Sequence, residues 1–320
     1  MLHLAASATE ENVLIAALKA LTNSWSVVPN NADRGYNMVD DNFVAVILNR
    51  IHDERPAVQA AAIDAGGVAF RTSNTNEALL DAYLELGASG SPQLRYAVMQ
   101  KVWQSSMPFE TQERIALFTN ALDAPEAWLV STALFRLKGH VPREDWGNAI
   151  RDKFLELTRH SDPGVRGRAA GALASMVGRL QASDPARVAA QARLVEMMDD
   201  ENPYTKSEAI SAQRSLNNLG AIPAIASHLD DATPNTYDIR DWQELDGSNG
   251  WTHHDGSAWS QVRDAALYAI KTMSRSVDRD NPFDYSINGQ TKDADLTAAA
   301  ASAREWVAAH RDALNAAAAQ

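Results

Sequence analysis

Residues 162–173 carry the sequence DPGVRGRAAGAL, and this stretch decides the fold class. Proline suits the first turn of a helix because its missing N–H would have no partner there, and Asp162 can accept from the free N–H groups of that turn. Behind the proline, Val165, Ala169 and Leu173 return at intervals of four residues. The stretch therefore predicts a capped helix with a buried apolar stripe.

Prolines of this kind recur along the chain, each after a short polar turn and each before an Ala- and Leu-rich segment. Their spacing is 33 to 40 residues, and the positions are Pro56, Pro92, Pro125, Pro163 and Pro203. A second series is expected to open the preceding helix of each pair, at Pro108, Pro142, Pro185 and Pro223. Two helices in each period of roughly 35 to 40 residues are typical of a solenoid of helical hairpins.

The repeats predict an all-α fold, a right-handed α-solenoid of about six helical hairpins with N- and C-terminal capping helices. The expected hairpins pair residues 41–51 with 55–70, 75–86 with 92–104, 109–122 with 125–138, 143–159 with 163–178, 185–199 with 203–219, and 221–229 with 258–276. The capping helices are expected over residues 9–21 and 294–318. Residues 1–320 are interpreted as one repeat domain, interrupted by irregular loops at 23–40, 231–257 and 277–292.

The repeated segments resemble a known family. Residues 162–166, DPGVR, and residues 262–267, VRDAAL, are similar to the second-helix signature of HEAT repeats, an armadillo-type helical family. Residues 56–61 and 92–97 are weaker copies, and the third and fifth copies carry Trp128 and Lys206 where arginine is usual. HEAT-like arrays are generally interaction scaffolds, and a few act as lyases or DNA glycosylases. The resemblance implies binding before catalysis.

Composition narrows the classes of partner. The net charge of −12 repels phosphate backbones, so no nucleic acid partner is expected and a DNA glycosylase is disfavoured. No apolar run approaches the ~20 residues that span a bilayer, which predicts a soluble acidic protein without a membrane span. The absence of cysteine excludes disulfides and thiolate metal sites, and it fits both a cytoplasmic and an exported protein. Oligomeric state stays open.

Four cations occupy one repeating position near the start of the second helices, and they are Arg95, Arg166, Lys206 and Arg263. They are called the ladder below. Such a ladder can face a ligand, or it can pair with turn acids such as Asp162 and tie neighbouring repeats together. We interpret it as structural.

No catalytic motif stands out. The chain lacks a His-Glu-x-x-His pair, a complete calcium loop and a Gly-x-Ser-x-Gly elbow, so no catalytic residue, metal ligand or cofactor is assigned. The only histidine cluster is His253, His254 and Asp255. The alternative function is therefore a HEAT-like lyase or hydrolase that uses this loop.

The segment 231–257 carries what specificity the sequence offers. The step from Thr205 to Val262 exceeds the repeat period by roughly 20 residues, which predicts an insertion on one face of the array. Its aromatic and polar side chains are typical of binding surfaces. The candidate partner-binding residues are Tyr237, Trp242, Trp251, His253, His254 and Asp255. The favoured function is a non-catalytic scaffold that binds a protein or peptide through the concave helix face and this loop.

Overall fold

The computed structural model describes residues 1–24, 41–70, 77–102, 111–140, 147–235, 239–240, 252–253, 261–278, 283, 285 and 293–318. These residues are almost entirely helical, which confirms the all-α prediction. They fall into two compact units, one up to residue 140 and one from residue 147, and each is described by itself. The handedness and the assignment of a single domain stay predictions.

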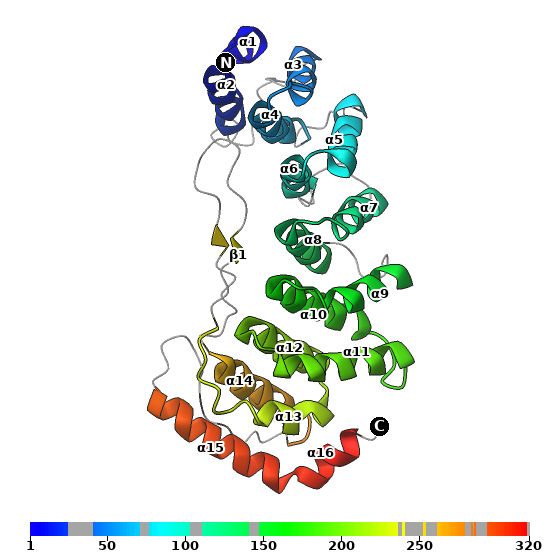
Figure 1. The fold of residues 1–320 in the computed structure, drawn as a ribbon, viewed down its shortest axis with the longest axis vertical. Coiled ribbons are helices and arrows are strands. Elements are labelled where there is room, and N and C mark those ends of the chain that lie inside the picture. Colours follow the sequence, from blue (N-terminus) through cyan, green and yellow to red (C-terminus); the bar gives the residue numbers. More distant parts are fainter. Residues whose placement is uncertain are drawn as a thin grey trace, which may run out of the picture. The chain divides into compact units, whose positions relative to one another are not determined.

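The first unit consists of two leading helices and three hairpins (Figure 1). The leading helices are α1 (Leu2–Ser7) and α2 (Glu11–Ser24). The hairpins are α3 (Asp41–Ile51) with α4 (Pro56–Ala69), α5 (Glu77–Ser89) with α6 (Pro92–Val102), and α7 (Thr111–Ala121) with α8 (Ala127–His140). Among the second helices, α6 packs against both α4 and α8. Among the first helices, α5 packs against both α3 and α7. This is the stacking expected of a helical-hairpin array.

The second unit continues the same pattern. Its hairpins are α9 (Asn148–Leu157) with α10 (Pro163–Val177), α11 (Pro185–Glu196) with α12 (Pro203–Ser215), and α13 (Ile222–Ala226) with α14 (Val262–Ser274); 3₁₀ turns cover η3 (Met197–Asp199) and η4 (Leu219–Ala221). The chain then forms α15 (Asp293–Ala309) and α16 (Arg311–Ala318). Helix α12 packs between α10 and α14, and α15 covers α14 and α13.

Helix α10 shows how tightly the second helices are enclosed. Its apolar stripe from Val165 to Leu173 is buried, and so are nearly all other residues of the helix. Gly167 faces the ring of Tyr204 on α12, and a Cβ built on Gly167 would lie 2.5 Å from Tyr204 Cε1. The glycine therefore sets how closely α10 and α12 approach.

The expected helix boundaries are largely confirmed, with three corrections at the turns. Helix α9 begins at Asn148 with Gly147 as its N-cap, so the prediction that Pro142 opens this helix was wrong. Helix α1 was not expected, and Ser7 ends it by donating to the carbonyl oxygen of His3. Pro125 lies in the turn before α8, two residues ahead of the first helical residue, Ala127. The buried residues Leu129 and Ala133 of α8 correspond to Val165 and Ala169 of α10, so Trp128 lies two residues before the ladder position. The prediction failed because proline also suits a turn outside a helix.

The two ends of the insertion, where it departs from the array and returns to it, pair with each other. Pro234 forms an antiparallel bridge with Gln261, and β1 (Ile239–Arg240) pairs antiparallel with β2 (Thr252–His253) in the register Ile239 to His253. The first turn of α14 is anchored to the other arm, since Val262 N–H donates to Thr233 O at 3.3 Å. The two ends of the insertion are thus joined by a bridge, a short strand pair and a backbone hydrogen bond. Most of the loops 23–40 and 277–292 lies outside the described residues.

The last helices close the second unit. Leu296, Ala303 and Trp306 of α15 are buried, while Asp295 and Glu305 on the other side are exposed. The ring of Trp306 packs against Phe283 and His310. This burial on one side agrees with the predicted cap of the array. Across the described ranges, no helix is both long enough and apolar enough to cross a membrane.

Replacing Gly167 with alanine tests the close approach of α10 and α12. The added methyl group overlaps the Tyr204 ring, so we expect a loss of about 1–3 kcal/mol in the free energy of unfolding, even though alanine favours helices. The matched control is Gly147→Ala, because a Cβ at Gly147 meets nothing within 4 Å. Urea denaturation measures both variants; equal stabilities would contradict the packing.

Candidate functional site

The residues predicted to bind a partner fall mainly outside the described part of the chain. This applies to Tyr237, Trp242, Trp251, His254 and Asp255. His253 is described through its backbone alone, as the β2 residue opposite Ile239. These side chains lie outside the described residues, so the partner-binding and enzymatic hypotheses for this loop stay predictions. Within the described ranges, no three His, Asp or Glu side chains lie together as a metal site requires.

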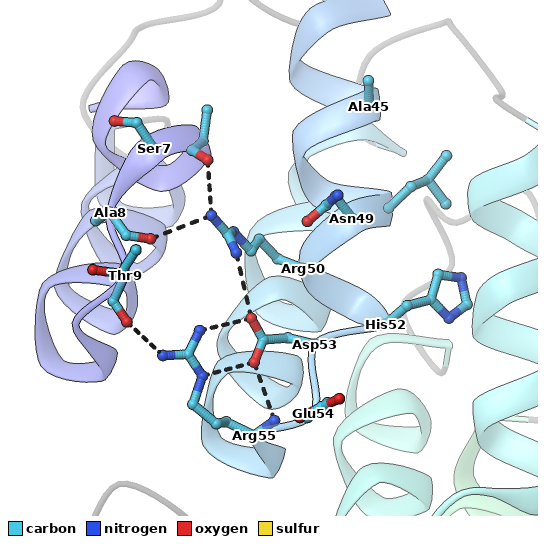
Figure 2. Close-up of a pocket in the computed structure, with 12 residues that line it drawn as sticks. Ser7, Ala8, Thr9, Ala45, Asn49, Arg50, His52, Asp53, Glu54 and Arg55 are labelled. Carbon is cyan, nitrogen blue, oxygen red and sulfur yellow. Dashed lines mark hydrogen bonds and ion pairs between the residues drawn. The ribbon is translucent and has the colours of Figure 1, made fainter.

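A large open hollow of about 1080 Å³ lies at the start of the first unit, between the α1–α2 turn and the α3–α4 turn (Figure 2). Arg50 donates from Nε to Ala5 O and from Nη2 to Ala6 O, both at 2.8 Å. Arg55 donates from Nη1 to Thr9 O at 2.8 Å. These carbonyls end or follow α1, where a helix leaves its last C=O groups without partners.

Asp53 accepts hydrogen bonds from both arginines of the hollow. It accepts from Arg55 Nε and Nη2 at 2.8 Å each, and from Arg50 Nη1 at 3.4 Å. The hydrogen bond from the Arg55 side chain, together with both positive charges, outweighs burial and lowers the pKa of Asp53 to about 2. Each guanidinium nitrogen is thus engaged by a carboxylate or a carbonyl. The hollow is an arginine clamp that holds α1 against the first hairpin.

A smaller hollow of about 450 Å³ lies between α9 and α11. Its floor is Leu173 of α10, and its sides include Leu155 and Ala190. The charged groups at its rim are few, and Arg151 pairs with Asp152 at 2.8 Å. The groove is mainly apolar, without the convergent polar groups that orient a small ligand.

The ladder cations join successive repeats. Arg166 forms a bidentate pair with Asp200 in the turn of the next hairpin, with both N–O distances at 2.8 Å. Its Nη1 also donates to His160 O and Ser161 O in its own turn. Asp162, the acid expected to pair with it, accepts from Val165 N–H and caps α10.

The other ladder cations follow the same rule. Lys206 reaches Asp231 at 3.2 Å, Arg263 pairs with Asp293 at the start of α15, and Arg95 donates to Asn120 at the end of α7. The structural interpretation of the ladder is confirmed. Its partners are in the following repeat, because a side chain near the start of one second helix faces the next turn along the stack.

The second helices of the first unit carry aromatic and cationic side chains on one face. Tyr96 of α6 and Trp128 of α8 pack edge to face, with ring centroids 5.7 Å apart. About two turns further along α8, the Arg136 guanidinium lies 5.5 Å from the centroid of the Phe135 ring and donates to Gln100 of α6. We call these five residues the α6–α8 face.

The α6–α8 face combines exposure with charge. Phe135 is 41% exposed although it is large and apolar, and Tyr96 and Trp128 are half-buried. Lys138 beside it is exposed. Sequence reasoning missed this face because Trp128 was assigned to the ladder. The spacing of seven residues from Trp128 to Phe135, two full helical turns, is the signal that places both rings on one side of α8.

Comparisons with known proteins add little. No protein-family model matches the chain, and no curated protein matches it. Among solved structures, an engineered protein determined by crystallography is similar, with 16% sequence identity and a TM-score of 0.35 over 95% of this chain and 97% of that chain. A similarity at this level carries no functional argument.

The arginine clamp predicts acid sensitivity. Because the pKa of Asp53 is lower in the folded chain than in the unfolded chain, its contribution to stability is present above about pH 4 and is lost as the pH falls from about 4 to about 2. Asp53→Asn should lose about 1–2 kcal/mol at pH 7 and remove this part of the acid dependence. Asp152→Asn, at a 65% exposed side chain, is the control. Denaturation of all three chains from pH 2 to pH 7 measures the effect, and an Asp53→Asn curve parallel to the unmodified one would contradict it.

A double-mutant cycle tests the ladder. The Arg166 and Asp200 side chains are 12% and 11% exposed, so their bidentate pair is shielded from solvent. Arg166→Met and Asp200→Asn should each destabilise the chain, and the cycle should give a coupling of about 1–2 kcal/mol. The same cycle on the exposed pair of Arg151 and Asp152 should give less than about 0.5 kcal/mol. Equal couplings would reject the special role of the ladder.

Proposed function

We propose that this chain is a non-catalytic binding array of the HEAT-like type, which holds a protein or peptide partner on the second helices and on the insertion. The observation that carries the proposal is the composition of the α6–α8 face. Tyrosine, tryptophan and arginine are the residues most enriched where alanine scanning finds binding energy concentrated.

The geometry of the face supports a protein partner more than a small molecule. The side chains lie along neighbouring helices of a regular stack, whereas the two hollows described above are the open one around the paired Arg50 and Arg55 and the mainly apolar groove between α9 and α11. Extended helix faces in repeat arrays suit extended polypeptides.

The charges of the face favour an acidic segment. Arg136 and Lys138 lie beside Phe135, whereas Lys101 is already paired with Asp64 of α4 at 2.7 Å. A partner segment with an aromatic or aliphatic anchor and neighbouring carboxylates would bury its anchor against Phe135 and bring its acids to the two cations. The insertion would add a second contact, since its base is joined to the array.

Selection of peptides tests this proposal. The full chain is used to enrich binders from a displayed library of random peptides, and affinities are measured for the enriched sequences. We expect acidic peptides with an apolar anchor, and Phe135→Ser should weaken them at least about tenfold while leaving the melting temperature unchanged. Val188→Ser is the matched control, because Val188 is an equally apolar and 51% exposed residue of the second unit.

A deletion separates the two parts of the proposed surface. Removal of residues 238–255 should weaken binding further if the insertion contributes. Peptides that bind the unmodified chain, the Phe135→Ser chain and the deletion chain with equal affinity would reject both surfaces. Peptides without acidic residues, or binding that depends on Val188 alone, would reject the assignment of the partner to the α6–α8 face.

A further inference from the structure

His228 is a buried histidine where the array meets the insertion. Its side chain is 10% exposed. It lies three residues before the ladder partner Asp231, and Met197 lies three residues before the ladder partner Asp200. Leu157 holds the corresponding buried position one repeat earlier. The array therefore places a titratable group where its two preceding repeats carry an apolar side chain.

Charged groups from three elements face the His228 imidazole. Its Nε2 lies 3.8 Å from Asp199 Oδ1 of η3, and Lys206 of α12 and Asp231 are close enough to influence it. Lys206 and Asp231 pair with each other at 3.2 Å. Helices α14, α15 and α16 also pack against α13. Their charged side chains include the pairs Arg263–Asp293 and Arg304–Asp230, Asp264, which accepts from the Gln261 N–H, and Lys271, which donates to Tyr285 O. The others are Asp295, Glu305, Arg311 and Asp312, which lie on α15 and α16.

Asp231 also fixes the base of the insertion. Its carboxylate accepts from Lys206 and from the Thr233 N–H at 3.1 Å, and its carbonyl accepts from the Arg263 N–H at 2.9 Å. Its own N–H donates to His228 O at 3.0 Å. One residue thus links the histidine, the preceding repeat and the first turn of α14.

We propose that His228, Lys206 and Asp231 form an acid-sensitive latch, which holds the base of the insertion against the array at neutral pH and loosens on acidification. The latch goes beyond the proposed function, since it does not require that the insertion bind anything. When the imidazole takes up a proton, a charge appears on a side chain that is only 10% exposed and whose nearest carboxylate, Asp199, lies 3.8 Å away. Because this buried charge is desolvated, states in which the junction opens to water become more favourable.

The direction of the titration agrees with this geometry. Burial lowers the pKa of His228 below its usual value of 6.5; Asp199 and Asp231 oppose this effect and Lys206 adds to it. A histidine with a lowered pKa in the folded state stabilises the fold fully above about pH 6.5. This contribution is lost as the pH falls from about 6.5 through the pKa of the folded state.

Amide hydrogen exchange on the full chain tests the latch. From about pH 6.5 downward, the protection of the Val262 and Arg263 amides, corrected for intrinsic exchange, should fall by up to about tenfold per pH unit. His228→Met places the residue of the preceding repeat at this position and should abolish this dependence. His52→Gln, at an exposed histidine, is the control and should leave it unchanged.

Titration of the His228 imidazole in the unmodified chain tests the latch even if a variant fails to fold. In the unmodified chain, the NMR resonance of His228 should titrate below about pH 6.5, and His228→Gln provides a second neutral replacement. A His228 resonance that titrates at or above this value would overturn the latch. So would acid-dependent exchange at Val262 and Arg263 that persists in the folded His228→Met or His228→Gln chain.

Discussion

Helix α10 must be covered on nearly all sides, and this constraint sets the architecture of its unit. Eleven of its fifteen residues are buried, including Gly164, Gly167 and Gly171, so no solvent-facing stripe remains. A single partner helix buries only one face of a helix. Helices α9, α11 and α12 all pack against α10, and the stack follows from the need to supply these neighbours. Because Gly167 admits the Tyr204 ring, the same constraint fixes the distance to the next repeat.

Packing of apolar stripes does not by itself set the register between repeats, and arginine supplies much of that specificity. Arg166 donates to a carbonyl of its own turn and to the Asp200 carboxylate in the turn of the next hairpin. These bonds fix the position of each hairpin relative to the other. Arg50 and Arg55 have a related role at the six-residue helix α1, where they donate hydrogen bonds to the carbonyl oxygens at and after its C-terminal end. The planar guanidinium suits both tasks because its donors point in fixed directions. The hydrogen bonds of these cations therefore serve the fold.

Helix positions could be predicted from the sequence where local chemistry and period agree. The cap Asp162 and the apolar spacing from Val165 to Leu173 both indicate α10, and its observed start is the predicted one. Around α8 the two signals conflict, because Pro125 marks a turn whereas the apolar residues begin their period at Leu129. With Pro125 as the predicted start of the helix, Trp128 falls at the ladder position. The α6–α8 face was missed for this reason. A surface of this kind depends on which residues of separate helices become neighbours, and no single repeat contains that information.

The insertion is compatible with the array because the start of α14 does not depend on the residues inside it. A helix needs partners for its first N–H groups, and here Val262 and Arg263 donate to the carbonyls of Thr233 and Asp231 across the base. Asp231 is in turn held by Lys206 of the repeat before. The position of α14 is therefore set by groups on the array side of the insertion. Residues beyond this base can vary in length and composition without shifting the stack, which is the property that a recognition element attached to a rigid repeat requires.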